Sequence, residues 1–111
     1  SPYVTSKWGV IGLMKSLAIE LGPYNIRVNA ICPGSVEGER LEKVIDAEIK
    51  TKGMTREEIY DAYTAGTSMK KLIKAEDIAK MALFLSGAGS RLVSGQVIAV
   101  DGHTEVPDPK L

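Results

Sequence analysis

The feature that most restricts how this chain can fold is a short apolar run at residues 26–32, directly followed by a proline and a glycine. The run is rich in β-branched residues, and Arg27 and Asn29 are its only polar members. Such a pattern is typical of a strand buried on both faces of a parallel sheet. A second run spans residues 96–100, and helical patterns between the two supply the crossover that parallel strands require. The sequence therefore predicts an α/β fold with two strands.

About four helices are predicted from the spacing of apolar residues and from capping, glycine and proline signals. They span residues 4–21, 39–52, 56–63 and 76–85. Residues 66–74 are expected to form a loop that Met69 and Leu72 anchor, and residues 101–111 an irregular tail.

Two of these helices have a predicted packed face. In the first, the apolar residues recur every three or four positions: Val4, Trp8, Ile11, Met14, Leu17, Ala18 and Leu21. In the last, the buried stripe comprises Ile78, Met81, Ala82 and Leu85. The first helix also contains Gly9 and Gly12, which favour close approach of another backbone.

Composition limits the possible partners. The 111 residues are 44% hydrophobic and 25% charged, which fits one globular unit. Fourteen basic residues balance fourteen acidic ones, so the charge favours neither nucleic acid nor an anionic membrane as a partner. The single cysteine, Cys32, excludes a disulfide within the chain and favours a cytoplasmic setting. Apolar runs fall far short of the ~20 residues that span a bilayer, and no metal site is predicted.

Tyr3 and Lys7 form a candidate acid/base pair at the start of the first helix. Residues four apart lie on one helix face, so a phenol and an ammonium can meet there. A tyrosine phenol titrates near 10, and a cation within about 4–6 Å lowers its pKa enough for proton exchange with a carbonyl or hydroxyl group. The spacing is also common in helices without a catalytic role, so an accidental pair on a generic α/β domain remains open.

Two further segments follow the Tyr3–Lys7 helix in a characteristic order: Asn-Ile-Arg-Val-Asn-Ala-Ile-Cys-Pro-Gly at residues 25–34 and Ser-Gly-Gln-Val-Ile-Ala-Val-Asp-Gly at residues 94–102. With these motifs the chain resembles the second half of the short-chain dehydrogenases/reductases. The resemblance implies the C-terminal half of a Rossmann-like doubly wound parallel sheet. Residues 1–111 would be the C-terminal part of one domain, with residues 39–67 as its substrate-binding region.

The resemblance also implies an activity: hydride transfer between NAD or NADP and a secondary alcohol or its ketone. Tyr3 would be the catalytic acid/base. Lys7 would lower the pKa of Tyr3 and hydrogen-bond the nicotinamide ribose. The choice between the two cofactors and the identity of the small-molecule substrate stay open.

By the same resemblance, the loop after the first strand would hold the nicotinamide. Pro33 and Gly34 would open this loop, the backbone of Val36 would bind the carboxamide, and Ser35 would line the substrate side. Gly38 stands where many members have a threonine, so the phosphate contact of that threonine is not implied here.

Other parts of the family pattern have no counterpart here. The glycine-rich dinucleotide turn and the catalytic serine would precede Ser1, which is itself too close to Tyr3 to be that serine. We therefore expect the dinucleotide-binding half to be absent and the 111 residues alone to be inactive. His103 follows Gly102 where many relatives have a second glycine, and a lone histidine here predicts a surface or interface residue.

The family pattern further implies a homo-oligomer, a dimer or a tetramer. Its interface would include Val97, Ala99, Met81 or Leu85. The alternative function is a non-catalytic fragment that acts only as a self-association module.

Overall fold

The computed structural model describes residues 1–104 of the chain. The molecule is elongated, with extents of 56 × 32 × 24 Å. Its elements follow in the order α1 (Pro2–Leu21), β1 (Ala30–Pro33), α2 (Glu39–Lys52), α3 (Arg56–Thr64), α4 (Ala75–Ser86) and β2 (Val97–Val100), with short 3₁₀ turns at Gly22–Tyr24 and Ala88–Ser90. The predicted α/β class, with two strands and four helices, is confirmed.

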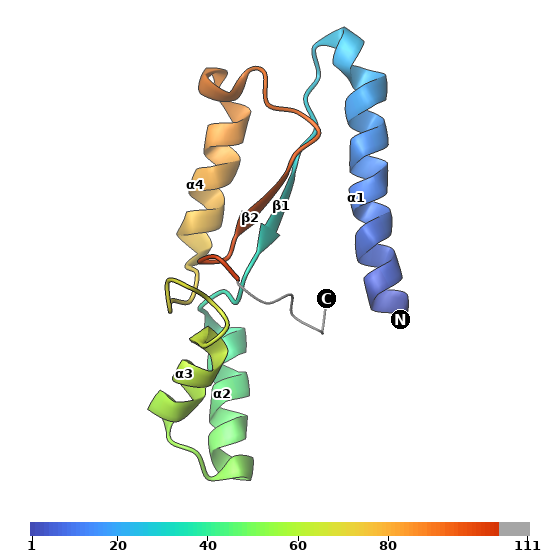
Figure 1. The fold of residues 1–111 in the computed structure, drawn as a ribbon. Helices are drawn as coiled ribbons and strands as arrows, with labels where there is room; N and C mark the ends of the chain where they lie inside the picture. Colours follow the sequence, from blue (N-terminus) through green and yellow to red (C-terminus); the bar gives the residue numbers. More distant parts are fainter. Residues whose placement is uncertain (105–111) are drawn as a thin grey trace.

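The two strands pair in parallel and form the centre of the molecule. Ala30 lies opposite Val97, and Pro33 lies opposite Val100. The connection between them runs through α2, α3 and α4. In Figure 1, α1 and α4 stand on opposite sides of the strands, while α2 and α3 project beyond the carboxyl ends of the strands. The sheet therefore has a helix on each side, as a doubly wound arrangement requires.

The predicted start of the first strand, at residue 26, is wrong. Regular pairing begins only at Ala30, because polar side chains occupy the backbone groups before it. The Val28 N–H donates to the Ser94 hydroxyl at 3.1 Å, and the Asn29 side chain bonds to Val93 O and to the Gln96 N–H. Side-chain hydrogen bonds of this kind compete with a regular strand ladder.

Arg27, the other polar residue of this segment, ties it to the end of α4. Its guanidinium donates to the carbonyls of Leu85 at 2.6 Å, Ser90 at 2.8 Å and Gly87 at 3.3 Å, and to the Ser90 hydroxyl. The last carbonyls of a helix lack partners within the helix. Arg27 thus satisfies the Leu85 carbonyl at the end of α4 and two carbonyls of the turn that follows, and it fixes this end of α4 beside the strand.

The first helix ends at Leu21 as predicted, begins two residues earlier than predicted, and has the predicted face except at Trp8. The Ser1 hydroxyl caps its start by accepting from the Val4 N–H. Met14 is buried, and the rest of the predicted face is half-buried: Val4, Ile11, Leu17, Ala18 and Leu21. Trp8 is 68% exposed and not packed as predicted. A Cβ on Gly9 or on Gly12 would meet nothing within 4 Å, so no close backbone approach occurs here among the described residues. The predictions for Trp8 and for the two glycines fail because no described element covers this part of α1.

The last helix is also less buried than predicted. Ile78, Met81 and Leu85 are half-buried, but Ala82 is exposed. α4 contacts β1 and β2 with one side only, and its remaining surface has no cover in the described part of the chain.

Helices α2 and α3 pack against each other as a hairpin with its own core. Ile45 and Ile59 are 2% and 1% exposed. α2 ends at Gly53, whose φ of 65° suits glycine, and the Thr55 hydroxyl starts α3 by accepting from the Glu58 N–H. Both boundaries are as predicted.

Two connectors join the hairpin to the rest of the molecule: the first, residues 34–38, leads from β1 to α2, and the second, residues 65–74, leads from α3 to α4. Val36 and Ile73 form a parallel bridge between the connectors, and Thr67 and Thr104 form an antiparallel bridge to the end of the β2 segment. Ile73 is buried, whereas the expected anchor Met69 is 59% exposed. The irregular tail predicted for residues 101–111 lies largely outside the described residues. Within residues 1–104, no helix is both long enough and apolar enough to cross a membrane.

Candidate active site

Tyr3 and Lys7 lie together on the first two turns of α1. The Lys7 Nζ is 5.3 Å from the centroid of the Tyr3 ring, within the range of a cation–π contact. Tyr3 is 52% exposed, so its phenol can reach a ligand. In Figure 1 the start of α1 lies at about the level of the carboxyl ends of β1 and β2, on the side of the strands away from α4. In open α/β sheets, ligands bind at the carboxyl edge.

The loop at residues 33–36 leaves this same edge. Pro33 ends β1, and the Gly34 N–H donates to Val100 O at 2.9 Å. A Cβ on Gly34 would lie 2.9 Å from the Cα and Cβ atoms of Asp101. No side chain fits there without displacing the backbone of the β2 segment, so glycine lets the loop turn close to the sheet.

The backbone of Val36 presents a free donor and acceptor beside this edge. Ile73 bonds to the two residues that flank Val36: the Ile73 N–H donates to Ser35 O at 2.9 Å, and the Glu37 N–H donates to Ile73 O at 2.7 Å. In a parallel pair, the residue between such bonds directs its own N–H and C=O to the opposite side. No residue among 1–104 bonds to these groups of Val36. One donor beside one acceptor fits a primary carboxamide, the group that the nicotinamide of NAD or NADP carries.

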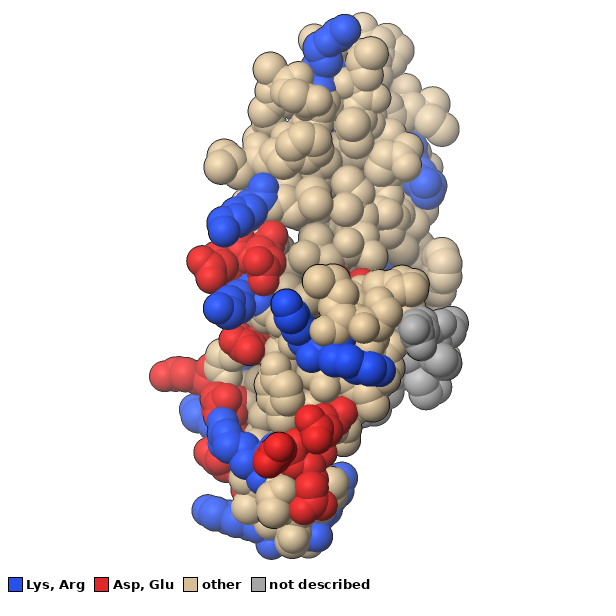
Figure 2. Space-filling view, turned by 60° about the vertical axis from the view of Figure 1, so that its left-hand side comes forward, with Lys and Arg blue, Asp and Glu red and all other residues tan. Residues whose placement is uncertain are grey.

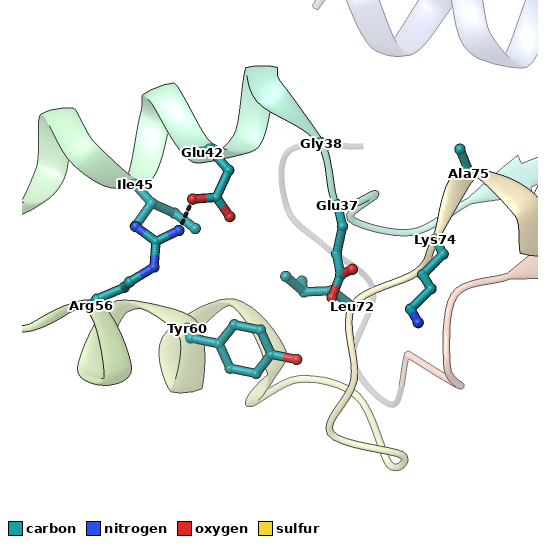
Figure 3. A pocket seen from close by; sticks show the side chains of 9 residues that line it. All are labelled: Glu37, Gly38, Glu42, Ile45, Arg56, Tyr60, Leu72, Lys74 and Ala75. Carbon is teal, nitrogen blue, oxygen red and sulfur yellow. Dashed lines mark ion pairs between the residues drawn. The ribbon is translucent and has the colours of Figure 1, made fainter.

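A pocket of about 530 Å³ lies at the base of the hairpin. Its walls come from α2, α3 and both connectors: Glu37, Gly38, Glu42, Ile45, Arg56, Tyr60, Leu72, Lys74 and Ala75. Figure 3 shows Arg56 and Glu42 joined across the hairpin side of the pocket, while the side chains of Glu37 and Lys74 flank its other end. Arg56 also pairs with Asp46 at 3.2 Å. These ion pairs neutralise the charge of Arg56. Lys74, the other cation of the pocket lining, forms no ion pair with any residue among 1–104.

One titratable group of the hairpin is perturbed. Burial, followed by the nearby Glu48 carboxylate, raises the pKa of the Tyr63 phenol. The Tyr63 hydroxyl donates to Glu48 Oε1 at 3.5 Å. This pair joins α3 to α2 and lies outside the pocket lining.

The predicted site residues form two groups. Tyr3 and Lys7 contact each other, and residues 33–36 form one continuous loop. No hydrogen bond or ion pair within residues 1–104 joins the two groups, and neither Tyr3, Lys7 nor Ser35 lines the pocket. In Figure 1 the start of α1 lies at about the level of the carboxyl ends of the strands but apart from them, to one side.

Sequence reasoning missed one polar contact at this edge. The His103 Nδ1 lies 2.7 Å from the Ser68 hydroxyl and is hydrogen-bonded to it. The two residues are 35 positions apart. His103 is exposed, as predicted for a surface residue, but its bond to Ser68 was not predicted. The available signal was the histidine itself, because it stands at a position where the family pattern has glycine.

Comparison with known proteins identifies this arrangement. The family described as enoyl-(acyl carrier protein) reductase matches residues 1–103. A D-beta-hydroxybutyrate dehydrogenase of Rhizobium meliloti is 36% identical over 103 residues, which cover 92% of this chain and 40% of the relative. The chain spans about 40% of the length of the curated relatives it matches.

Solved structures agree with the fold. A short chain dehydrogenase family protein from Francisella tularensis superposes with a TM-score of 0.80 at 29% identity, over 90% of this chain and 41% of that protein. The actinorhodin polyketide ketoreductase variant F189W, solved with NADPH, superposes with a TM-score of 0.76 at 35% identity, over 91% of this chain and 39% of that protein. The prediction of part of a Rossmann-like sheet is thus confirmed. With its match over residues 1–103, this chain belongs to the short-chain dehydrogenase/reductase family.

Proposed function

We propose that residues 1–111 supply the acid/base and substrate-binding part of an NAD- or NADP-dependent oxidoreductase that acts on a secondary alcohol or its ketone. The observation that carries this proposal is the Tyr3–Lys7 pair at the start of α1, with Tyr3 exposed and 5.3 Å between ammonium and ring centroid. Family membership supports it. Because the chain spans about 40% of its relatives' length, the activity belongs to the complete protein, expressed from the whole coding sequence that contains these residues.

In this proposal Tyr3 moves the proton. Its Oη donates to the carbonyl oxygen of a ketone, or accepts the proton of an alcohol in the reverse direction. The Lys7 ammonium stabilises the phenolate that remains after donation, because an adjacent cation favours the charged form. The nicotinamide cofactor, when bound, supplies or accepts the hydride.

The residues after β1 fit the nicotinamide end of the cofactor. The free N–H and C=O of Val36 would bind the carboxamide, and Lys7 would also hydrogen-bond the ribose. Pro33 and Gly34 would form the adjoining wall, where the close contact of Gly34 with Asp101 fixes the course of the backbone. We expect the 111 residues alone to bind no dinucleotide at micromolar concentration, which calorimetry with NADH and NADPH can check.

The α2–α3 hairpin would form most of the substrate-binding region, assigned to residues 39–67. It supplies Ile45, Arg56 and Tyr60 to the pocket at its base. Ser35 lies on the connector that leads into this pocket and would face the substrate. The charged lining favours a polar substrate over a purely apolar one. A cytoplasmic location is part of the proposal.

An assay at 340 nm tests the proposal in the complete protein. We expect reduction of ketones with NADH or NADPH, and Lys7→Ala should lower kcat and weaken cofactor binding together. Lys15→Ala is the matched control, because Lys15 lies on the same helix but donates to Gly95 O, away from the proposed site. Equal effects of the two substitutions would contradict the role of Lys7.

A second candidate function, self-association, rests on exposed apolar side chains. Leu83, Phe84 and Leu92 are all more than half exposed, and they lie on α4 and on the segment after it. In Figure 2, charged side chains gather over the lower half of the visible face, and few lie on the upper half. Extensive exposed apolar surface marks an interaction site. Among the interface residues predicted from the family, Val97 and Ala99 are exposed, whereas Met81 and Leu85 are half-buried.

We propose that this surface forms a symmetric dimer or tetramer contact, in addition to the catalytic role. Leu83→Glu combined with Leu92→Glu should convert the oligomer to monomer in light scattering. An unchanged oligomer mass would exclude this surface as the contact.

A further inference from the structure

Three hydrogen bonds clamp the second connector of the hairpin to the end of the β2 segment. The Ser68 N–H donates to His103 O at 2.8 Å, as part of the Thr67–Thr104 bridge, and the Met69 N–H donates to Gly102 O at 3.1 Å. The third is the 2.7 Å hydrogen bond between the side chains of Ser68 and His103. It is the side-chain contact of the clamp, and therefore the part that depends on residue identity.

The backbone of this clamp carries conformations that are unfavourable for most side chains. His103 has a φ of 63° and Lys70 a φ of 52°, both in the left-handed region where glycine is preferred. Contacts hold both residues in place: the His103 N–H donates to Asp101 Oδ1 at 2.9 Å, and the Lys70 Nζ donates to Ala65 O at 2.6 Å. Such conformations persist where the surroundings fix them, and they concentrate at ligand clamps and switches.

The clamp lies where it can set the shape of the pocket. The Val36–Ile73 bridge joins the two connectors of the hairpin to each other. The Ser68–His103 clamp joins the second connector to the end of the β2 segment. The pocket takes its walls from the hairpin and from both connectors. A change in the position of the hairpin therefore changes the pocket.

We propose that Ser68 and His103 are positioning residues that hold the α2–α3 hairpin against the carboxyl edge of the sheet in its substrate-binding position. This inference rests on the proposed oxidoreductase function. Without the side-chain bond, the hairpin spends part of its time in other positions. Substrate affinity falls with the fraction of molecules in the competent position, whereas the reaction of bound substrate is unchanged.

The test uses the complete protein with Ser68→Ala, with His103→Gly and with both substitutions. His103→Gly removes the imidazole without adding backbone strain, because glycine accepts the left-handed conformation. Each substitution should raise KM for the ketone about three- to tenfold and change kcat less than twofold, and the double variant should be no worse than the single ones because they remove the same bond. His103→Asn, which keeps a hydrogen-bonding side chain and tolerates this φ, should recover part of the loss.

Hydrogen exchange supplies a readout that does not depend on turnover. Residues 65–74 should exchange faster in Ser68→Ala and His103→Gly, while α1 exchanges at an unchanged rate. Ser86→Ala is the matched control, since its hydroxyl bonds only within α4, to Ala82 O. Unchanged exchange at residues 65–74, or parallel loss of kcat and cofactor binding, would overturn the proposal. If the unsubstituted protein reduces no ketone, the proposed function fails, and faster exchange would still support the clamp.

Discussion

Helix α1 and the α2–α3 hairpin differ in what covers their apolar side chains. In the hairpin, α2 and α3 pack against each other, and Ile45 and Ile59 are almost completely buried. Over its 20 residues, α1 buries only Met14 and leaves Trp8 and Ile19 largely exposed. The proposed substrate-binding part thus holds its shape through internal contacts. The helix that carries Tyr3 instead presents apolar side chains that no residue among 1–104 covers.

The strongest test of this difference is truncation of the hairpin core. Ile45→Ala or Ile59→Ala should lower the free energy of unfolding by about 2–5 kcal/mol, because each leaves a cavity in a closed core. Val44→Ala, at the neighbouring exposed position on α2, is the matched control and should cost less than about 1 kcal/mol. Urea unfolding measures both. Similar losses for Ile45 and Val44 would show that the hairpin has no core of its own.

Helix α4 should depend on a single polar contact more than α1 does. Arg27→Ala should destabilise the protein by about 2–3 kcal/mol, since it removes charged hydrogen bonds to the carbonyls at the end of α4. Arg91→Ala, a substitution of an exposed arginine in the segment after α4, is the control and should be close to neutral. Thermal unfolding followed by circular dichroism distinguishes the two variants.

The glycines of α1 report directly on whether its surface is covered. In this structure a Cβ on Gly9 or Gly12 meets nothing within 4 Å. Alanine at either position should therefore stabilise the 111-residue chain by about 1 kcal/mol, the difference in helix propensity. A loss of stability in the complete protein, measured by the same unfolding experiment, would reveal a neighbour packed closely on this face.

The smallest expected effect is the pH dependence of the hairpin. Burial and Glu48 raise the pKa of Tyr63 in the folded protein, so the folded state holds this proton more tightly than the unfolded chain does. The resulting stability is fully present below pH ~10 and is lost as the pH rises through the raised pKa. Tyr63→Phe should remove this alkaline loss in urea unfolding at pH 9–11, and an unaltered pH profile would contradict it.

Much of the fold follows from signals that lie close together in the sequence. Gly53 and Thr55 mark where α2 ends and α3 begins because their conformations and hydrogen bonds are local. The contact between Tyr3 and Lys7 also follows from one turn of helix. These features could be predicted without knowing the rest of the structure.

Features made by distant residues could not be predicted in this way. The first strand starts late because Val28 and Asn29 bond to residues 64–67 positions away. The Ser68–His103 bond likewise exists only because the hairpin returns the chain to the end of β2. The exposure of Trp8 depends on which elements lie beside α1, and the spacing of apolar residues shows only that the helix has an apolar face.

The central claim is that Tyr3 moves the proton, and Tyr3→Phe in the complete protein tests it most directly. The change removes the transferable proton and keeps the ring under Lys7. We expect kcat to fall about 10²–10⁴-fold, the usual contribution of general acid catalysis, with the Kd for NADH or NADPH nearly unchanged. Tyr24→Phe, at an exposed tyrosine just beyond the same helix, is the control and should retain full activity. Retention of more than about a tenth of the normal kcat by Tyr3→Phe would contradict the account.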